Sequence, residues 1–369
     1  MKNKLIVSTT SKSYPIYFKS GILNSTGALI EKNIIGVKKI CIITDNKLPN
    51  FLLKKLTKSL KKYDLKIYKL KTNEKTKSFK IANRIIEDLL KNNFNRSDCV
   101  IALGGGIIGD LSAFVASLTK RGIKFVNIPT TLLAQVDASI GGKTAINSYE
   151  GKNLIGTFYQ PDLILTDVEL LKSLPQREMI AGYAEILKHS LILNKKFFTW
   201  LSKNGGKIIN HKSSIELEKA IIKSCKIKGN IVSKDEKEIN LRMILNFGHT
   251  FAHGLEAAKK FSKKIIHGEA VLIGMMLASD LSHKKKLLPE KELLLIKKHY
   301  NDLNLPYKMS KVFKKNEIKK IVNFMKKDKK NNIEKIDLIL LNKIGKTTKP
   351  KKIALNSKEN NKFLNHTFN

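Results

Sequence analysis

The sequence has few cysteines and no long apolar run, and both absences limit the class of protein. The three cysteines, Cys41, Cys99 and Cys225, are odd in number and scattered, which is not the pattern of a disulfide framework. Cys41 and Cys99 lie in apolar, strand-like segments, which predicts buried free thiols in a reducing compartment. No apolar run reaches the ~18 residues of a membrane span. Residues 1–7 contain no signal-peptide core. We therefore expect a cytoplasmic protein with no membrane partner.

Arginine is also scarce, although the chain is strongly basic. Only five of the 70 basic residues are arginine, and the net charge of +39 at pH 7 comes from lysine spread over almost every segment. A specific nucleic-acid surface would need arginine to read bases and interleaved aromatic side chains to stack on them. Neither is concentrated anywhere in the chain. The composition argues against a specific nucleic-acid partner, whereas the positive charge favours anionic substrates.

The first half of the chain alternates between strand-like and helix-like patterns. At 369 residues the chain is long enough for two domains, each with its own core. Residues 1–20 read as one or two edge strands. The alternation that follows predicts a Rossmann-like, doubly wound parallel sheet. The expected strands are 39–45, 65–70, 97–103 and 162–167, and the expected helices are 47–62 and 78–92.

The pattern changes near Leu174 and Pro175, beyond which long helical periodicity dominates. We expect an α/β domain over residues 1–172 and a mostly α-helical, metal-binding domain over residues 173–345. Residues 204–206 read as a turn, and residues 336–341 as the one late strand. The lysine-, asparagine- and serine-rich residues 346–369 are expected to form a poorly packed tail.

A glycine-rich turn follows the strand expected at 97–103. Gly104, Gly106 and Gly109 satisfy the G-x-G-x-x-G pattern between a strand and a helix, where backbone N–H groups can meet a pyrophosphate. The usual fingerprint also has an acid about 20 residues later for the ribose. Residues 124–134 contain none, so Asp45, at the end of an earlier strand, is the candidate for this contact. The alternative is a glycine turn that only serves packing.

Two histidines in the second half have the spacing of metal ligands. His249 and His253 are four residues apart, which places them on one face of a helix. His267 and Glu185 supply a third imidazole and a carboxylate. Two histidines and one carboxylate, with one position open, form a common catalytic zinc site. The alternative is a solvated histidine pair on a helix surface.

Several stretches together carry a family resemblance. They are residues 104–110, 128–143, 151–161, 181–188, 241–253, 267–271 and 325–330. In this order they resemble the 3-dehydroquinate synthases, the sugar-phosphate cyclases of the shikimate pathway. The resemblance extends over roughly residues 5–345. These stretches together are much more specific than the glycine pattern or the histidine pair alone.

The resemblance implies an activity with two cofactors. Family members use bound NAD and a divalent metal, usually zinc, to convert 3-deoxy-D-arabino-heptulosonate 7-phosphate into 3-dehydroquinate and phosphate. A ring hydroxyl is oxidised, phosphate is eliminated, the carbonyl is reduced again, and an intramolecular aldol closes the carbocycle. NAD is regenerated in each turnover. The family also implies a homodimer.

The resemblance assigns roles by position in this sequence. The metal, zinc or cobalt, falls to Glu185, His249 and His267. Catalytic roles fall to His253, Glu238, Arg121 and Lys152. Substrate binding falls to Lys152, Asn153, Lys188, Lys228, Arg242 and Asn246, and to one of Lys329 or Lys330. NAD binding falls to Asp45, Glu74, Lys77, Gly104, Gly105, Gly106, Ile107, Ile108, Gly109, Asp110, Thr130, Thr131, Asp137, Lys143, Lys152, Leu170, Leu171, Lys172 and Ser173.

The sequence departs from the family pattern near one expected cofactor loop. Thr72 and Asn73 stand where the family usually has Asp-Gly, and Thr76 replaces a tyrosine. His189 replaces another tyrosine after Lys188. Two related activities remain open: a metal-dependent polyol dehydrogenase, which would release reduced cofactor, and a cyclase for a different sugar phosphate. A basic nucleic-acid-binding protein without activity is the alternative from another class.

Overall fold

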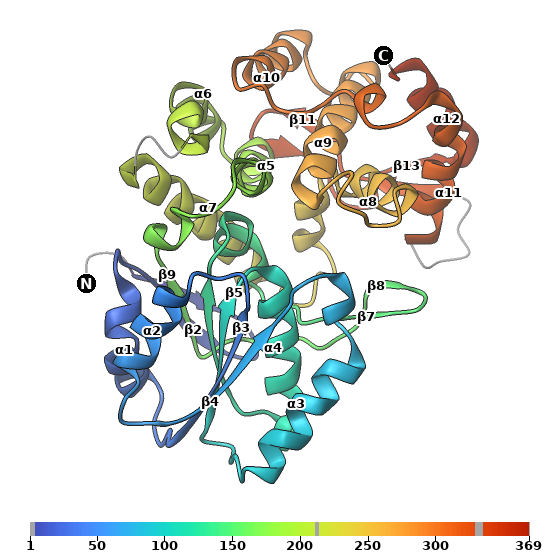
Figure 1. The fold of residues 1–369 in the computed structure, drawn as a ribbon. Helices are drawn as coiled ribbons and strands as arrows, with labels where there is room; N and C mark the ends of the chain where they lie inside the picture. The colour runs from blue at the N-terminus through green and yellow to red at the C-terminus, as the bar shows by residue number, and fades with distance from the viewer. Residues whose placement is uncertain (1–3, 211–213, 329–334, 369) are drawn as a thin grey trace. The chain divides into compact units, whose positions relative to one another are not determined.

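The computed structural model describes residues 4–210, 214–328 and 335–368. The chain forms two compact units (Figure 1). Met1–Pro175 and Leu217–Lys237 make the first unit, and Gln176–Glu216 and Glu238–Asn369 make the second. The single boundary expected after residue 172 therefore does not describe the chain fully, because a later segment returns to the first unit.

A seven-stranded sheet forms the centre of the first unit, in the order β1-β2-β9-β6-β5-β3-β4. All neighbouring strands are parallel except β1 and β2. The strands are β1 (Lys4–Ser8), β2 (Ser13–Phe18), β3 (Lys39–Asp45), β4 (Asp64–Leu70), β5 (Cys99–Gly104), β6 (Lys124–Pro129) and β9 (Leu163–Thr166). The predicted α/β fold is confirmed, with an antiparallel strand at one edge.

Helices cover both faces of this sheet (Figure 1). Helices α1 (Thr26–Asn33) and α2 (Asn50–Ser59) pack on one face, and α3 (Phe79–Lys91) and α4 (Gly106–Leu118) on the other. Because both faces are covered, all six residues of β5 are buried, as expected for a central parallel strand. Helix α3 begins where the Ser78 side chain accepts from the Ile81 backbone N–H.

The strand order contains one point where the winding direction reverses. From β3 the chain moves to β4 on one side, and then to β5 on the other side of β3. In open α/β sheets, ligands bind at the carboxyl ends of the strands beside such a point. The topology therefore places a ligand site at the ends of β3 and β5.

Helix α7 (Ser214–Lys234) explains why residues 217–237 return to the first unit. Gly229 approaches Val7 so closely that an added Cβ would lie 3.0 Å from its Cγ2. The Cys225 thiol donates to the carbonyl of Gln135 at 3.3 Å. A helical sequence pattern alone does not indicate which domain a helix joins.

The second unit is mostly helical, as predicted. Its helices are α5 (Gln176–Leu193), α6 (Lys195–Ile209), α8 (His249–Ala258), α9 (His267–Lys284), α10 (Glu290–Asp302), α11 (Ile318–Asp328) and α12 (Ser357–His366). Four short strands form two pairs: β10 (Lys335–Leu338) with β13 (Ile353–Asn356), and β11 (Leu341–Lys343) with β12 (Lys346–Thr347). No helix in the described ranges is long and apolar enough to cross a membrane.

Three local predictions for this unit are wrong. The single late strand expected over residues 336–341 is divided between β10 and β11, which pair with different strands. Residues 204–206 are not a turn but lie inside α6, where Gly205 lets the Tyr183 hydroxyl approach the helix closely. Residues 346–369 are not a poorly packed tail. Phe363 and Leu364 of α12 are buried, and the Phe363 ring lies 6.0 Å from that of Phe251. Widely spaced apolar residues fix this segment despite its polar composition.

Candidate metal centre and cofactor site

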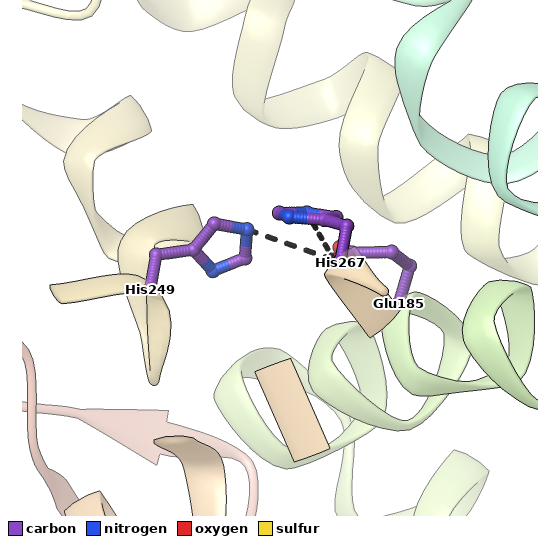
Figure 2. Close-up of side chains that lie close together, drawn as sticks. All are labelled: Glu185, His249 and His267. Carbon is purple, nitrogen blue, oxygen red and sulfur yellow. Dashed lines mark ion pairs between the residues drawn. The ribbon is translucent and has the colours of Figure 1, made fainter. Parts of the chain in front are cut away.

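Three side chains of the second unit converge on one point (Figure 2). Glu185 comes from the middle of α5, whereas His249 and His267 are the first residues of α8 and α9. The Nε2 atoms of His249 and His267 lie 3.6 and 3.9 Å from Glu185 Oε1. The three ligand atoms lie within 4.8 Å of one another.

These donors fit a divalent metal of the zinc type. Ligand atoms about 2.1 Å from a tetrahedral zinc ion are separated by about 3.4 Å, close to the separations observed. Glu185 is fully buried, and its Oε1 accepts no hydrogen bond from the described part of the chain. Its Oε2 forms an ion pair with Lys188, one turn further along α5. A buried carboxylate oxygen that faces two imidazoles without hydrogen bonding to them is suited to a cation.

Each imidazole is oriented by a group behind it. His249 Nδ1 donates to the carbonyl of Phe247 at 3.3 Å, and His267 Nδ1 donates to Glu256 Oε2 at 3.0 Å. A carbonyl only accepts, so this contact places a proton on His249 Nδ1 and turns Nε2 toward Glu185, the orientation that a metal ligand at Nε2 requires. Burial lowers the pKa of His267, but the attraction of Glu256 outweighs this and raises it to about 9.

Glycines beside the ligands allow the helices to approach closely. Gly248 precedes His249 with a φ of +79°, and a Cβ there would lie 2.7 Å from the Met275 backbone nitrogen. A Cβ on Gly268, which follows His267, would lie 2.2 Å from the Cα of Ala181. Both contacts are with backbone atoms, which cannot move aside. The ligand positions therefore depend on glycine at these two places.

Further polar side chains lie beside this cluster in the second unit. The His253 ring centroid is 5.6 Å from that of His249 and 6.4 Å from that of His267. His253 is not part of the ligand group formed by the other three residues. Asn246 Nδ2 donates to Glu238 Oε1 at 2.9 Å, and Glu238 has a left-handed φ of 60°. Such conformations are uncommon for glutamate and concentrate at functional sites.

The first unit presents a nucleotide-type site at the reversal point. Asp45 ends β3, Gly104 ends β5, and Thr130 directly follows β6, the next strand in the sheet. Helix α4 starts after Gly105, and no side chain caps its N-terminus. Its first N–H groups therefore have no partner within the helix, and they suit a pyrophosphate.

Two of these glycines make the turn possible. A Cβ on Gly104 would lie 2.7 Å from that of Ile108, and one on Gly105 would lie 3.0 Å from the Thr131 side chain. The absence of both side chains lets β5, α4 and the Thr130–Thr131 segment come together. The fit to a dinucleotide therefore rests on the glycines, the uncapped helix and the adjacent Asp45.

The comparisons with known proteins match both units. A family model described as 3-dehydroquinate synthase N-terminal matches residues 67–181, and one described as 3-dehydroquinate synthase C-terminal matches residues 182–331. The chain is 50% identical over 361 residues to the 3-dehydroquinate synthase of Pelagibacter ubique (strain HTCC1062), covering 98% of this chain and 97% of that protein. The chain belongs to the 3-dehydroquinate synthase family.

Another relative and two solved structures are also similar to this chain. The chain is 43% identical over 304 residues to the 3-dehydroquinate synthase of Rhizobium johnstonii (strain DSM 114642 / LMG 32736 / 3841), covering 82% and 80% of the two chains. Among solved structures, 2-epi-5-epi-valiolone synthase from Streptomyces hygroscopicus subsp. jinggangensis 5008, with NAD+ and Zn2+ bound, has a TM-score of 0.84 at 25% identity over 96% of both chains. A 2-deoxy-scyllo-inosose synthase has the same fold, with a TM-score of 0.88 at 23% identity over 99% and 100% of the chains.

Residues 72–76, where the chain departs from the 3-dehydroquinate synthase pattern, form a well-bonded turn. The Thr72 hydroxyl donates to Asp45 Oδ2. Asn73 Oδ1 accepts from the Lys75 N–H at 2.8 Å, and Thr76 Oγ1 accepts from the Asn73 N–H at 3.1 Å. These bonds cap the short helix η2 (Glu74–Thr76). The substituted residues therefore hold the turn by their own side chains, without the glycine that the family usually has.

The substrate residues that the family resemblance implies divide between the units. Lys152, Asn153 and Lys228 belong to the first unit, and Lys188, Arg242 and Asn246 to the second. Lys188 and Arg242 are 1% and 2% exposed, which is unusual for cations and typical of functional sites. Lys329 and Lys330 lie outside the described residues.

The remaining cofactor and catalytic candidates all lie in the first unit. Asp137 accepts from Lys228 Nζ through both its carbonyl, at 2.6 Å, and its carboxylate, at 2.7 Å. Leu170 and Leu171 are buried, whereas Lys143, Lys172 and Ser173 are exposed. Arg121 is exposed, with a left-handed φ of 62°.

Two further groups support the metal cluster and were not predicted from the sequence. Glu256 lies seven residues after His249 and three after His253, so all three share one face of α8, and this spacing was the available signal. Arg177 on α5 forms a bidentate pair with Glu269 on α9, at 2.6 and 2.7 Å. Glu269 also accepts from the Ile266 N–H, next to His267. This pair fixes the start of α9, and no local pattern predicted it.

Proposed function

We propose that this protein is a 3-dehydroquinate synthase, which converts 3-deoxy-D-arabino-heptulosonate 7-phosphate into 3-dehydroquinate and phosphate. The observation that carries the proposal is the convergence of Glu185, His249 and His267 in a chain 50% identical to a 3-dehydroquinate synthase over nearly its whole length. NAD and a divalent metal, zinc or cobalt, are the proposed cofactors. The 2-epi-5-epi-valiolone synthase of the same fold carries NAD+ and Zn2+.

The metal ligands are Glu185 Oε1 and the Nε2 atoms of His249 and His267. When bound, the metal supplies a Lewis acid for a substrate hydroxyl, and NAD supplies a reversible hydride acceptor. His253 stands next to two of the ligands, and its imidazole relays protons at the reacting carbons and oxygens. Glu238, hydrogen-bonded to Asn246, is the carboxylate that accompanies it.

The cofactor residues are those at the reversal point of the sheet. The uncapped N-terminus of α4 and the Gly104–Gly106 turn receive the pyrophosphate, and Asp45 accepts from the ribose hydroxyls. Thr72 orients Asp45 for this contact. Thr130 and Thr131 follow β6 at the same edge of the sheet, and Lys143 lies further along the chain.

The substrate carries a carboxylate and a phosphate, so its site needs several cations. Lys152, Lys188, Lys228 and Arg242 supply them, and Asn153 and Asn246 bind hydroxyls. Lys188 and Arg242 are almost completely buried, so their charges are little screened by solvent. Arg121 and Lys329 or Lys330 are the candidates for the phosphate. The homodimer and the cytoplasmic location stay predictions from the family resemblance.

The test is phosphate release by purified protein supplied with zinc, a catalytic amount of NAD and the heptulosonate phosphate. A 3-dehydroquinate synthase releases phosphate over many turnovers while NADH absorbance stays flat, because the cofactor is regenerated. Steady NADH accumulation without phosphate would make the protein a dehydrogenase instead. Phosphate release from another sugar phosphate, but not from this one, would keep the cyclase class and change the substrate.

One substitution tests the metal centre while leaving the fold and the NAD site intact. Glu185→Gln keeps the size of the side chain but removes the charge that a cation needs, so we expect loss of zinc and of phosphate release. NAD binding should remain within a few-fold, because the glycine-rich site belongs to the other unit. Full activity in this variant would contradict the assignment of the ligand.

A further inference from the structure

A short hairpin of the first unit carries two of the proposed substrate residues and has little apolar anchoring. Strands β7 (Ile146–Ser148) and β8 (Gly151–Ile155) pair antiparallel and extend away from the sheet (Figure 1). Ile146 is buried, but Tyr149 at the tip is fully exposed, and Leu154 and Ile155 are about 40% exposed. An isolated two-stranded hairpin is only marginally stable. The position of the β7–β8 hairpin therefore depends on polar contacts with other segments of the first unit.

Those contacts come from the segment Glu74–Lys77. The Asn147 N–H donates to the carbonyl of Lys77 at 2.7 Å, and Asn147 Nδ2 donates to the carbonyl and the carboxylate of Glu74 at 2.9 and 3.0 Å. Lys152 Nζ donates to Glu74 Oε1 at 2.8 Å. Lys77 Nζ donates to Asn153 Oδ1 at 2.6 Å. Five polar contacts thus hold the hairpin on two residues, Glu74 and Lys77.

Lys77 also contacts α4, the helix that follows the glycine-rich turn. Lys77 Nζ also donates to Asp110 Oδ2 at 2.5 Å, in the second turn of α4. Lys77 is only 5% exposed, so both partners share one desolvated ammonium group. A buried ammonium that loses either partner must find another, because an unpaired charge in this environment is costly. The ammonium group of Lys77 therefore links Asp110 of α4 to Asn153 of the hairpin.

We propose that Lys77 is a positioning residue that couples the cofactor site at the start of α4 to the hairpin that carries Lys152 and Asn153. Binding of the dinucleotide at the glycine-rich turn fixes Asp110, Asp110 fixes the ammonium of Lys77, and Lys77 fixes Asn153. The hairpin is thereby ordered before the sugar phosphate arrives. This inference rests on the proposed function for the identity of the two ligands. It adds a coupling between the two sites, through which each ligand favours binding of the other, and a residue that carries this coupling.

Two features of Asn153 support a role in this coupling. Its φ of 57° is left-handed, which asparagine tolerates better than most residues. Its backbone N–H donates to Asn147 Oδ1 at 3.0 Å, across the hairpin. Asn147 is itself bonded to Glu74 and Lys77. The side chain of Asn153 therefore contacts Lys77 directly, and its backbone is connected through Asn147 to Glu74 and Lys77.

Hydrogen exchange followed by mass spectrometry tests the coupling without any enzymatic turnover. In the wild-type protein, NAD should slow amide exchange at residues 104–110, where it binds. It should also slow exchange at residues 146–155 by at least about fivefold, which is the lower end of typical coupling between two sites. Asn153→Ala keeps the Lys77–Asp110 pair, so NAD should still protect residues 104–110 but no longer protect the hairpin. Lys77→Met should lose the hairpin effect as well.

Lys75→Met is the matched control, because Lys75 has an exposed side chain in the same turn. It should respond to NAD as the wild type does. If Lys77→Met does not fold, Asn153→Ala still decides the question. Hairpin protection that persists in Asn153→Ala would overturn the coupling, as would wild-type protection at residues 104–110 alone; both results leave the proposed function standing. No protection at either segment would refute the proposed cofactor and the coupling with it.

Discussion

Removing the carboxylate behind His267 should weaken metal binding without touching a ligand. Glu256 Oε2 accepts from His267 Nδ1 at 3.0 Å, and Glu256 is 6% exposed. A hydrogen bond to a charged group is worth about 1.5–3 kcal/mol, which corresponds to about 10- to 150-fold in affinity. Groups that orient metal-bound histidines typically change affinity by about 10- to 100-fold. We expect Glu256→Ala to weaken zinc binding within this range.

The assay is zinc competition against a chromophoric chelator at pH 7, which needs no substrate. Glu256→Gln keeps an oxygen that accepts from Nδ1 but loses the charge, so its affinity should lie between wild type and Glu256→Ala. Glu317→Ala is the control, because Glu317 also pairs with a cation in the second unit, Lys259 at 2.9 Å, but contacts no metal ligand. If Glu256→Ala binds zinc within twofold of wild type, the orientation of His267 by Glu256 is refuted.

Two further predictions concern stability. Gly205→Ala should lower the free energy of unfolding by about 1–3 kcal/mol, because its Cβ would lie 2.5 Å from the Tyr183 hydroxyl oxygen. Gly206→Ala, whose Cβ meets only Leu303 at 3.7 Å, should stabilise by about 0.5–1 kcal/mol in urea denaturation; equal effects would disprove the packing argument. Burial lowers the pKa of His299 from 6.5 to about 4, so its contribution to stability is complete above pH 6.5 and is lost as the pH falls toward 4. Wild-type protein should lose up to about 3 kcal/mol across this window, and His299→Gln should show a flatter pH dependence; parallel curves would refute the assignment.

The parts of the fold that could be predicted are those with a local pattern. The alternation of apolar strands and amphipathic helices up to residue 172 leads directly to a parallel sheet, because each strand and helix has its own period. The glycine turn after β5 and the polar end of β3 also have local signatures. Their meeting at one edge follows from parallel topology, although the reversal between β3 and β5 became visible only in the structure.

The parts that could not be predicted depend on distant partners. Whether α7 packs on the first or the second unit is decided by contacts such as Gly229 with Val7, and its own periodicity does not contain them. Gly205 and Gly206 read as a turn because glycine weakens helices, yet the close approach of Tyr183 requires a glycine there. In the second unit, the spacing of His249 and His253 indicated a metal site. The family resemblance then selected Glu185, His249 and His267 as the candidate ligands. Glu256 could have been found from its spacing on α8, but many acidic residues in helices have such spacing to a histidine.

Anomalous scattering at the zinc absorption edge, from a crystal of the protein grown with zinc, tests the central claim most directly. The site described here predicts one strong peak about 2.1 Å from each of three atoms: Glu185 Oε1, His249 Nε2 and His267 Nε2. His253 should lie outside this coordination sphere. A peak bound by His253 in place of His267, or zinc held elsewhere in the chain, would contradict the metal centre and the function proposed from it.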